Sequence, residues 1–280
     1  MMRAVYLVGA CLIVTGCSGP VELAPVAKVE KAEPEVAMTR EFAVPVLMYH
    51  RICDLTPKEE KSRFMRDLTV SPKDFEDQLR FLKENGFSFL HATEVADALR
   101  TGKALPEKAV AITMDDGYRD NFTDALPILK KYGAKATVFI VTNNFGKAER
   151  LSWPNVLEMG REKVAFESHT VSHPDLRRLS DDQLWDELVR SKQILEVGTG
   201  KLVTSLAYPA GEFDDRVVAM TERAGYLSAW KKGGGPVRPG DAASPYLLPR
   251  IRVHGRTDLE KFRTRVMSGV YVIEDERRDS

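Results

Sequence analysis

Cysteine is scarce in this chain, with three in 280 residues. Cys11 and Cys17 both lie near the amino terminus, so Cys53 is the one cysteine expected in the folded part, and a disulfide framework is excluded. An excess of charge is also missing, since 41 basic residues balance 41 acidic ones, and we expect no nucleic-acid partner. With ordinary apolar content, the length suffices for one sizeable core.

The amino terminus lacks an apolar run long enough to span a bilayer comfortably. MMRAVYLVGACLIVTGCSG instead has one basic residue, a short apolar run and small residues before a cysteine, which is typical of a signal peptide. VTGC resembles a bacterial lipobox, so we expect residues 1–16 to be removed and Cys17 to be lipidated; an ordinary signal peptide and an uncleaved anchor are the alternatives. Ser18 favours sorting to the outer membrane, on its periplasmic or surface face. Residues 17–43 are predicted to form a flexible tether.

Strand-like and helical segments alternate from Val44 onward. AVAIT, ATVFIV, KVAFE and TSLAY are each followed by a helical pattern, and SPKDFEDQLRFLKENG predicts a helix with Ser71 as N-cap and Pro72 in the first turn. This alternation implies right-handed parallel βαβ units. We predict a single α/β domain over residues 44–268, with a closed or nearly closed β/α barrel favoured over a doubly wound open sheet, and a charged tail over 269–280.

Chemically active side chains follow the predicted strands at their carboxyl ends, where both architectures place active sites. Asp115 and Asp116 follow AVAIT, whereas His169 and His173 follow KVAFE. The histidines are four residues apart, so one helical turn would place both imidazoles within reach of one ion. Two imidazoles and a carboxylate form a metal site with open positions for water and substrate. One aspartate would then bind the ion, and its neighbour would accept a proton from water beside it.

The strand-end motifs also resemble those of a known family. TMDDG, SHTVSHP and AYPAG, in this order, resemble the first three motifs of the polysaccharide deacetylases, the NodB-homology group or carbohydrate esterase family 4. PVLMYHRI and LPRIRV are similar to the branch that includes the poly-β-1,6-N-acetylglucosamine deacetylases of biofilm systems. The resemblance covers about residues 44–266. It implies a distorted (β/α)7 barrel, one divalent ion and hydrolysis of N-acetyl groups on an aminosugar polymer, with zinc as the expected ion and cobalt or nickel as alternatives.

The resemblance assigns roles to individual residues. Asp115 corresponds to the catalytic base, and Asp116, His169 and His173 correspond to the metal ligands. Further roles are implied around the substrate: a groove wall at Tyr208 and Pro209, an oxyanion donor at the backbone amide of Ala210, and a pocket for the acetyl methyl at Trp230. A core tryptophan is the alternative for the last residue.

Two expected roles depart from the family pattern. Ala207 stands where many members carry an arginine that orients the base, and we expect Arg250 in LPRI to replace it. His254 falls near the final motif, where a histidine acts as general acid, although a plain surface histidine is the alternative. Tyr49 and His50 end the first predicted strand, and we expect hydrogen-bonding roles for them in the floor of the site.

The motifs predict a metal-dependent polysaccharide N-deacetylase. A catalytically silent glycan-binding lipoprotein is one alternative, because a fold can persist without its activity. An O-acetyl esterase and a peptidoglycan deacetylase are the others, because ester and amide hydrolysis share the attacking water. The expected partners are an N-acetylated polysaccharide, a membrane reached through the lipidated amino terminus, and polymer-export machinery carried by a separate chain.

Overall fold

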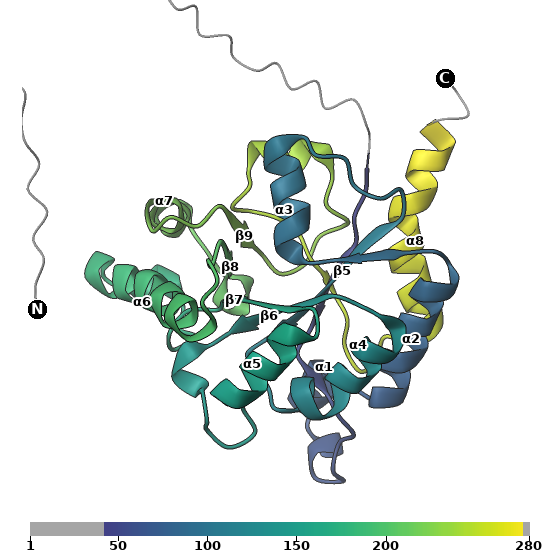
Figure 1. Cartoon of the computed structure of the whole chain (residues 1–280), viewed down its shortest axis with the longest axis horizontal. Helices are drawn as coiled ribbons and strands as arrows, with labels where there is room; N and C mark the ends of the chain where they lie inside the picture. Colours follow the sequence, from purple (N-terminus) through teal and green to yellow (C-terminus); the bar gives the residue numbers. More distant parts are fainter. Residues whose placement is uncertain (1–41, 277–280) are drawn as a thin grey trace, which may run out of the picture. The chain divides into compact units, whose positions relative to one another are not determined.

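Parallel strands form the centre of the molecule and helices surround them (Figure 1). The structure is a computed structural model that describes residues 42–276, with side chains described up to Ser268. The strands are β1 Val46–Tyr49, β2 Arg51–Ile52, β3 Thr69–Val70, β4 Ser88–Leu90, β5 Ala109–Asp115, β6 Ala136–Ile140, β7 Val164–Ser168, β8 Ser205–Ala207, β9 Ser228–Trp230 and β10 Ile251–Arg252. The α-helices are α1 Arg63–Leu68, α2 Pro72–Glu84, α3 Ala92–Thr101, α4 Leu126–Tyr132, α5 Trp153–Arg161, α6 Asp181–Thr199, α7 Asp215–Arg223 and α8 Leu259–Glu276.

The main sheet is parallel and curled. Its strands follow the order β10-β1-β5-β6-β7-β8-β9, and β4 pairs with the first half of β5. In the described part of the chain, β9 and β10 do not pair as strands; the isolated bridges Trp230–Leu248 and Gly233–Arg250 span the seam between them. The predicted single α/β domain with a barrel-like parallel sheet is therefore confirmed, and its closure is incomplete at this seam.

Helix starts follow the capping residues of the sequence. The Ser71 hydroxyl accepts a hydrogen bond from the Asp74 N–H group at the start of α2, as the sequence predicts. Ser180 caps α6 by accepting from Gln183 N–H, and the Gln183 side chain completes the capping box. Because these local signals place the helices correctly, the strand ends between them lie where the sequence predicts.

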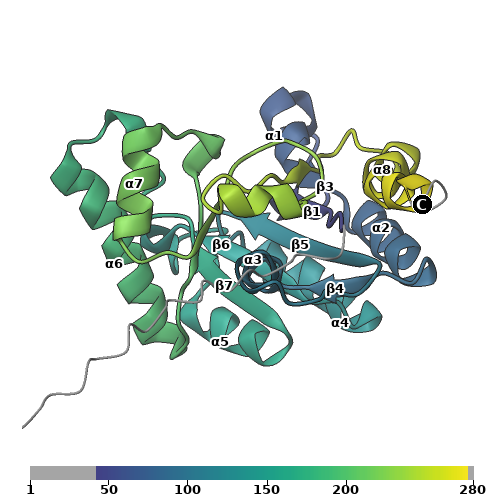
Figure 2. The same ribbon diagram turned by 90° about the horizontal axis from the view of Figure 1, so that it is seen from above.

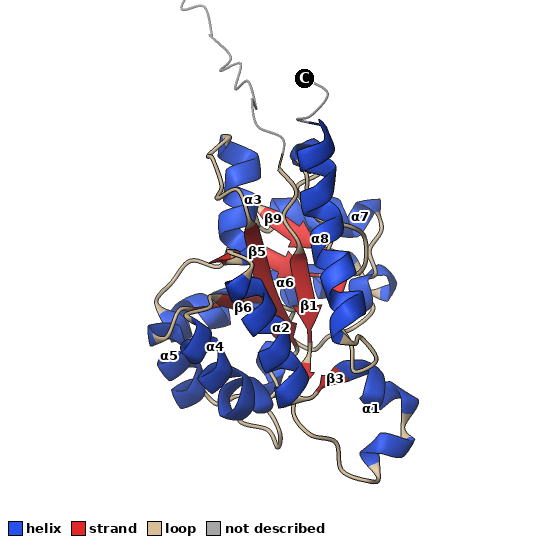
Figure 3. Cartoon of the chain, turned by 90° about the vertical axis from the view of Figure 1, so that its right-hand side faces the viewer, coloured by secondary structure: helices blue, strands red, loops and turns tan. Residues whose placement is uncertain are grey.

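The two faces of the sheet have separate cores. Alternate residues of β5 point to opposite sides: Val110 and Ile112 pack under the outer helices, whereas Ala111 packs on the inner side of the curl. Helix α3 contributes Val95 and Leu99 to the inner core and is seen nearly end-on in front of the strands in Figure 2. The remaining helices lie around the strands (Figure 3). The inner side of the curl is the side on which the site described below is built.

Helix α8 extends further than predicted. The pattern predicts a helix ending near Ser268 and a charged tail after it, but the structure continues the helix to Glu276. VYVIEDE, at positions 270–276, contains no proline or glycine that would stop a helix. Helix α8 packs beside α2 at one edge of the domain (Figures 1 and 2). Of the helices within residues 42–276, none has the length and apolar character needed to cross a membrane.

Candidate active site

The two adjacent aspartates lie at the end of the buried strand β5. Asp115 is its last residue and is 3% exposed. Asp116 follows in a left-handed conformation with φ 72°, and Gly117 continues the turn with φ 67°. A non-glycine residue in this conformation costs about 1 kcal/mol or more, and such strain concentrates at functional sites. The turn separates the two carboxylates. Asp115 stays inside the curled sheet, and Asp116 reaches the open end of the curl where the strands end, which we call the mouth.

The two histidines follow β7 in an irregular loop and not in a helical turn. His169 is 2% exposed, and its Nδ1 lies 2.7 Å from the carbonyl oxygen of Ala207. A carbonyl only accepts, so Nδ1 carries the proton and the Nε2 lone pair stays free. His173 has φ 62° and directs its Nε2 to the same place from the exposed side. The sequence spacing predicts the convergence of the two imidazoles but not the backbone conformation that produces it.

Asp116, His169 and His173 form a set of donors suited to a divalent ion. Oδ1 of Asp116 lies 3.6 Å from Nε2 of His169 and 3.7 Å from Nε2 of His173, and one ligand atom from each residue lies within 4.8 Å of the others. Two ligands at zinc-bond lengths and a tetrahedral angle would be about 3.4 Å apart. The contacts are thus too long for strong hydrogen bonds but close to the spacing of ligands around one ion. Three protein ligands also leave room for water or substrate.

Arg250 reaches across the inside of the curl to Asp115. Its Nη1 donates to Oδ1 at 2.6 Å and its Nη2 donates to Oδ2 at 2.8 Å, so the pair is bidentate. Both side chains are almost completely buried, and the guanidinium also packs over the ring of Phe139. Burial would raise the pKa of Asp115, but the charge of Arg250 and the field of His169 outweigh it and hold the pKa at about 2. Arg250 therefore lies where an arginine could orient the base.

Sequence reasoning underestimates the part that one ionisable residue near the site, His50, plays in it. Its electrostatic partners are Asp115, Asp116, Arg250 and His169, and its Nδ1 is buried without a hydrogen-bond partner in the described structure. Burial lowers its pKa, and the two carboxylates oppose that shift. Tyr49, the preceding residue, points to the other side of the sheet, where its hydroxyl donates a hydrogen bond to the side chain of Gln78 at 2.7 Å. The alternation along β1 was the available signal for this difference.

The third motif forms a tight turn after β8. Ala210 is exposed and left-handed, with φ 55° and ψ 3°. Its N–H group has no hydrogen-bond partner among the described residues, as an oxyanion donor requires. Tyr208 differs from its predicted role, because its side chain is fully buried in the outer core beside Phe213 and does not line a groove. Pro209 is buried next to it.

Three other predicted residues lie outside this cluster. Trp230 is fully buried in the inner core with Phe139, which corresponds to the alternative of a core tryptophan. The charged groups that act most strongly on His254 are Arg265, Arg252, Arg256 and Asp67, and none of these four belongs to the site. Its expected role as general acid therefore has no support in the geometry, because it follows β10, whereas Arg250 precedes that strand. Cys17 lies outside the described residues.

Comparisons with known proteins agree with this arrangement. The family model for polysaccharide deacetylases matches residues 102–229. YxkH of Bacillus subtilis (strain 168), which is named as a polysaccharide deacetylase, is 31% identical over 274 residues, or 90% of this chain and 93% of the relative. The chain belongs to the polysaccharide deacetylase family. The first two motifs follow β5 and β7 of one parallel sheet, with β6 between them.

Other members of the family extend the comparison. The poly-β-1,6-N-acetyl-D-glucosamine N-deacetylase of Staphylococcus aureus (strain MSSA476) is 26% identical over 248 residues, covering 81% of this chain and 84% of the relative. The structure of the Streptococcus pyogenes deacetylase PplD in complex with acetate superimposes with a TM-score of 0.76 at 31% identity, over 81% of this chain and 99% of that one. The predicted NodB-type fold is thereby confirmed.

Proposed function

We propose that this protein is a metal-dependent deacetylase that removes N-acetyl groups from a polysaccharide containing N-acetylglucosamine. One observation carries the proposal: the ligand atoms of Asp116, His169 and His173 converge at the mouth, while Asp115, paired with Arg250, lies beside them. The relative from S. aureus is named for this reaction, and PplD was captured with acetate, which is the acid product of any deacetylation.

Each residue of the site has a distinct part in the proposed reaction. Asp116, His169 and His173 would hold a divalent ion, which would supply the Lewis acid that lowers the pKa of water and polarises the acetyl carbonyl. Asp115 accepts a proton from the attacking water. Each of its two oxygens accepts one hydrogen bond from Arg250 and keeps a further lone pair that can take this proton. The N–H of Ala210 donates to the developing oxyanion. His50, in its imidazolium form next to the two carboxylates, gives its proton to the leaving amine in place of His254 and becomes a neutral imidazole.

Acetate release measures the proposed activity directly. The protein is incubated with oligomers of poly-β-1,6-N-acetylglucosamine, chitin oligosaccharides, peptidoglycan and O-acetylated xylan. We expect the fastest release from the first, loss of activity with a chelator, and recovery when zinc, cobalt or nickel is added back. Preference for xylan would instead indicate an esterase, preference for peptidoglycan a different glycan, and binding without release a silent protein. Full activity after removal of all metal would contradict the mechanism.

His50→Gln is expected to lower kcat on N-acetylated substrate by about 10²–10⁴-fold, because an amine leaves only when protonated. An aryl acetate has a leaving group that needs no proton, so its hydrolysis should fall much less. His91→Gln is the matched control, because His91 lies at the start of α3 with its Nε2 beside the carbonyl oxygen of Lys163. Equal losses on both substrates would show that His50 only maintains the shape of the site.

We further propose that a lipid on Cys17 attaches the domain to a membrane, the outer membrane in a Gram-negative cell, with residues 17–43 as the tether and any polymer exporter on a separate chain. The lipobox-like VTGC supports this proposal. In cells fed a labelled fatty acid, we expect the label in the parent and in Cys53→Ala but not in Cys17→Ala, which should also leave the membrane fraction. Labelling that persists in Cys17→Ala would refute it.

A further inference from the structure

A basic pocket lies apart from the candidate site, where β10, α8 and the loop after β9 meet. Its volume is about 350 Å³, and its wall includes Arg252, His254, Arg265 and the segment 234–236. Gly234 has φ 112°, and a Cβ there would come within 2.6 Å of the Cβ of Pro249, so only glycine fits. The loop thus contributes backbone, and the side chains that give the pocket its charge come from β10, α8 and the turn between them.

The charges around this pocket are unbalanced. Among the described residues, no aspartate or glutamate lines it. The groups that act on His254 are Arg265, Arg252 and Arg256, which are cations, and Asp67, the one anion among them. The carboxylate of Asp67 already pairs with Arg256 at 2.7 Å. Burial and the three arginines lower the pKa of His254. The field inside the pocket is therefore positive and favours an anion.

Hydrogen-bond donors in the wall remain available. Nδ1 of His254 accepts from the N–H of Arg256 at 3.2 Å, so in the neutral imidazole the proton is on Nε2, which can donate. Arg252 donates a hydrogen bond from Nη2 to the carbonyl oxygen of Asp67, and its Nε is buried without a hydrogen-bond partner in the described structure. Arg265 uses Nη1 for the carbonyl of Arg252. A guanidinium has five N–H donors, so both arginines can bind a further acceptor.

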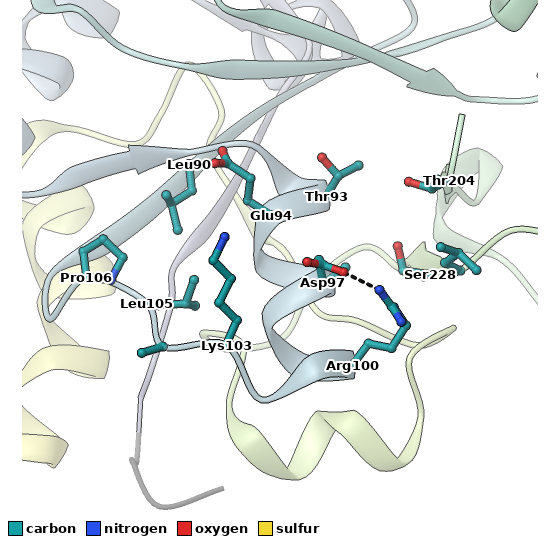
Figure 4. Close-up of a pocket in the computed structure, with 13 residues that line it drawn as sticks. Leu90, Thr93, Glu94, Asp97, Arg100, Lys103, Leu105, Pro106, Thr204 and Ser228 are labelled. Atoms are coloured by element: carbon teal, nitrogen blue, oxygen red, sulfur yellow. Dashed lines mark hydrogen bonds and ion pairs between the residues drawn. The ribbon is translucent and has the colours of Figure 1, made fainter. Parts of the chain in front are cut away.

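A second polar cavity shows that this imbalance is not general. It has a volume of about 420 Å³ and lies between α3 and the amino-terminal ends of β8 and β9 (Figure 4). Its lining contains two carboxylates, Glu94 and Asp97, and two cations, Arg100 and Lys103. Arg100 is paired with Asp97, as the dashed line in Figure 4 shows, and Glu94 is paired with Lys135. Its charges compensate each other, so it gives no reason to expect an ionic ligand.

We propose that the pocket formed by Arg252, His254 and Arg265 binds an oxyanion, a phosphate or carboxylate group. Planar arginine forks match the oxygens of both groups, and the Nε2–H of His254 can add a third donor. The site is separate from the metal ligands, but it shares a chain segment with Arg250, two residues before Arg252. His254 is thus assigned to anion binding and not to proton transfer in the deacetylation.

Sulfate is the first probe, because its charge does not change near neutral pH. The pKa of His254 is measured by NMR in the full chain, with sulfate or with sodium chloride at matched ionic strength. A bound anion favours the imidazolium, so sulfate should raise the pKa of His254 in a saturable manner, and its affinity should increase as the pH falls. An equal shift with chloride would mean screening alone and would overturn the proposal, as would the absence of any shift.

Two substitutions on α8 provide the matched comparison. Arg265→Gln should weaken sulfate binding by about tenfold or more, because it removes one charged fork. Arg263→Gln should leave binding unchanged, because Arg263 packs over the ring of Phe81 and does not line the pocket. His254→Gln tests the proposal independently in case Arg265→Gln does not fold. Sulfate should still bind to His254→Gln, but its affinity should no longer depend on pH. Titrations with inorganic phosphate and with succinate then distinguish the two ligand classes. Equal sulfate affinity in the parent and Arg265→Gln would refute the assignment.

Discussion

Asp115→Asn is expected to lower kcat for acetate release by about 10²–10⁴-fold, with little change in KM. Asparagine has nearly the shape of aspartate, but its amide cannot take a proton from the attacking water. The metal ligands stay in place, because Asp116 follows in its own left-handed turn. The measurement is initial rates of acetate release from the preferred glycan, together with the metal content of the purified variant.

Asp186→Asn is the control for this variant. It makes the same chemical change on the exposed face of α6, where the Asp186 side chain is 62% exposed, and it should leave kcat unchanged. If Asp115→Asn loses activity and also loses its metal, the aspartate supports the ion and not the proton transfer. If it keeps full activity with metal bound, Asp115 is not the base.

Arg250→Ala is expected to lower the free energy of unfolding by about 3–5 kcal/mol, because it leaves the Asp115 carboxylate buried without its partner. It should also lower kcat, since the carboxylate loses both hydrogen bonds that orient it. Urea unfolding at neutral pH measures the first effect. Arg263→Ala, which removes an arginine on α8, should change stability by much less. Stability and turnover both equal to those of the parent would contradict this role of Arg250.

The same pair predicts how stability depends on pH in metal-free protein. In the unfolded chain the pKa of Asp115 is about 4, and in the folded protein it is about 2. The unfolded chain therefore binds the proton first, so the stabilisation is complete above pH 4 and is lost as the pH falls from about 4 to about 2. Its size is about 2 kcal/mol. In Asp115→Asn this contribution to the pH dependence should be absent, and an unchanged curve would contradict the assignment.

The fold could be predicted from the sequence because its signals are local. Ser71 and Ser180 cap their helices through residues three positions away, and strand patterns recur between such helices. The extent of α8 could not be predicted in this way, since the charged residues near the end of the chain are equally compatible with a helix and with a tail. The same local signals order the strand ends, which is why the sequence predicts a site containing Asp116, His169 and His173.

The less successful predictions concern side-chain direction over long separations. Tyr208 and Trp230 both occupy strand ends, yet one packs in the outer core and the other in the inner core. Neighbouring residues of a strand point to opposite faces of the sheet, so a shift of one position along the strand moves a side chain from the mouth of the site to the core. The same alternation decides that His50, and not Tyr49, faces the carboxylates.

By itself, the sequence determined the order of strands and helices, the family, and the residue types that can bind a metal, because each depends on short stretches of chain. Only the tertiary structure decided which residues meet across the curled sheet. Arg250 and Asp115 are 135 residues apart in the chain and form two hydrogen bonds, whereas His254, four residues beyond Arg250, belongs to a different, basic pocket. Strand register and the curl of the sheet fix such contacts, and no local pattern in the sequence encodes them.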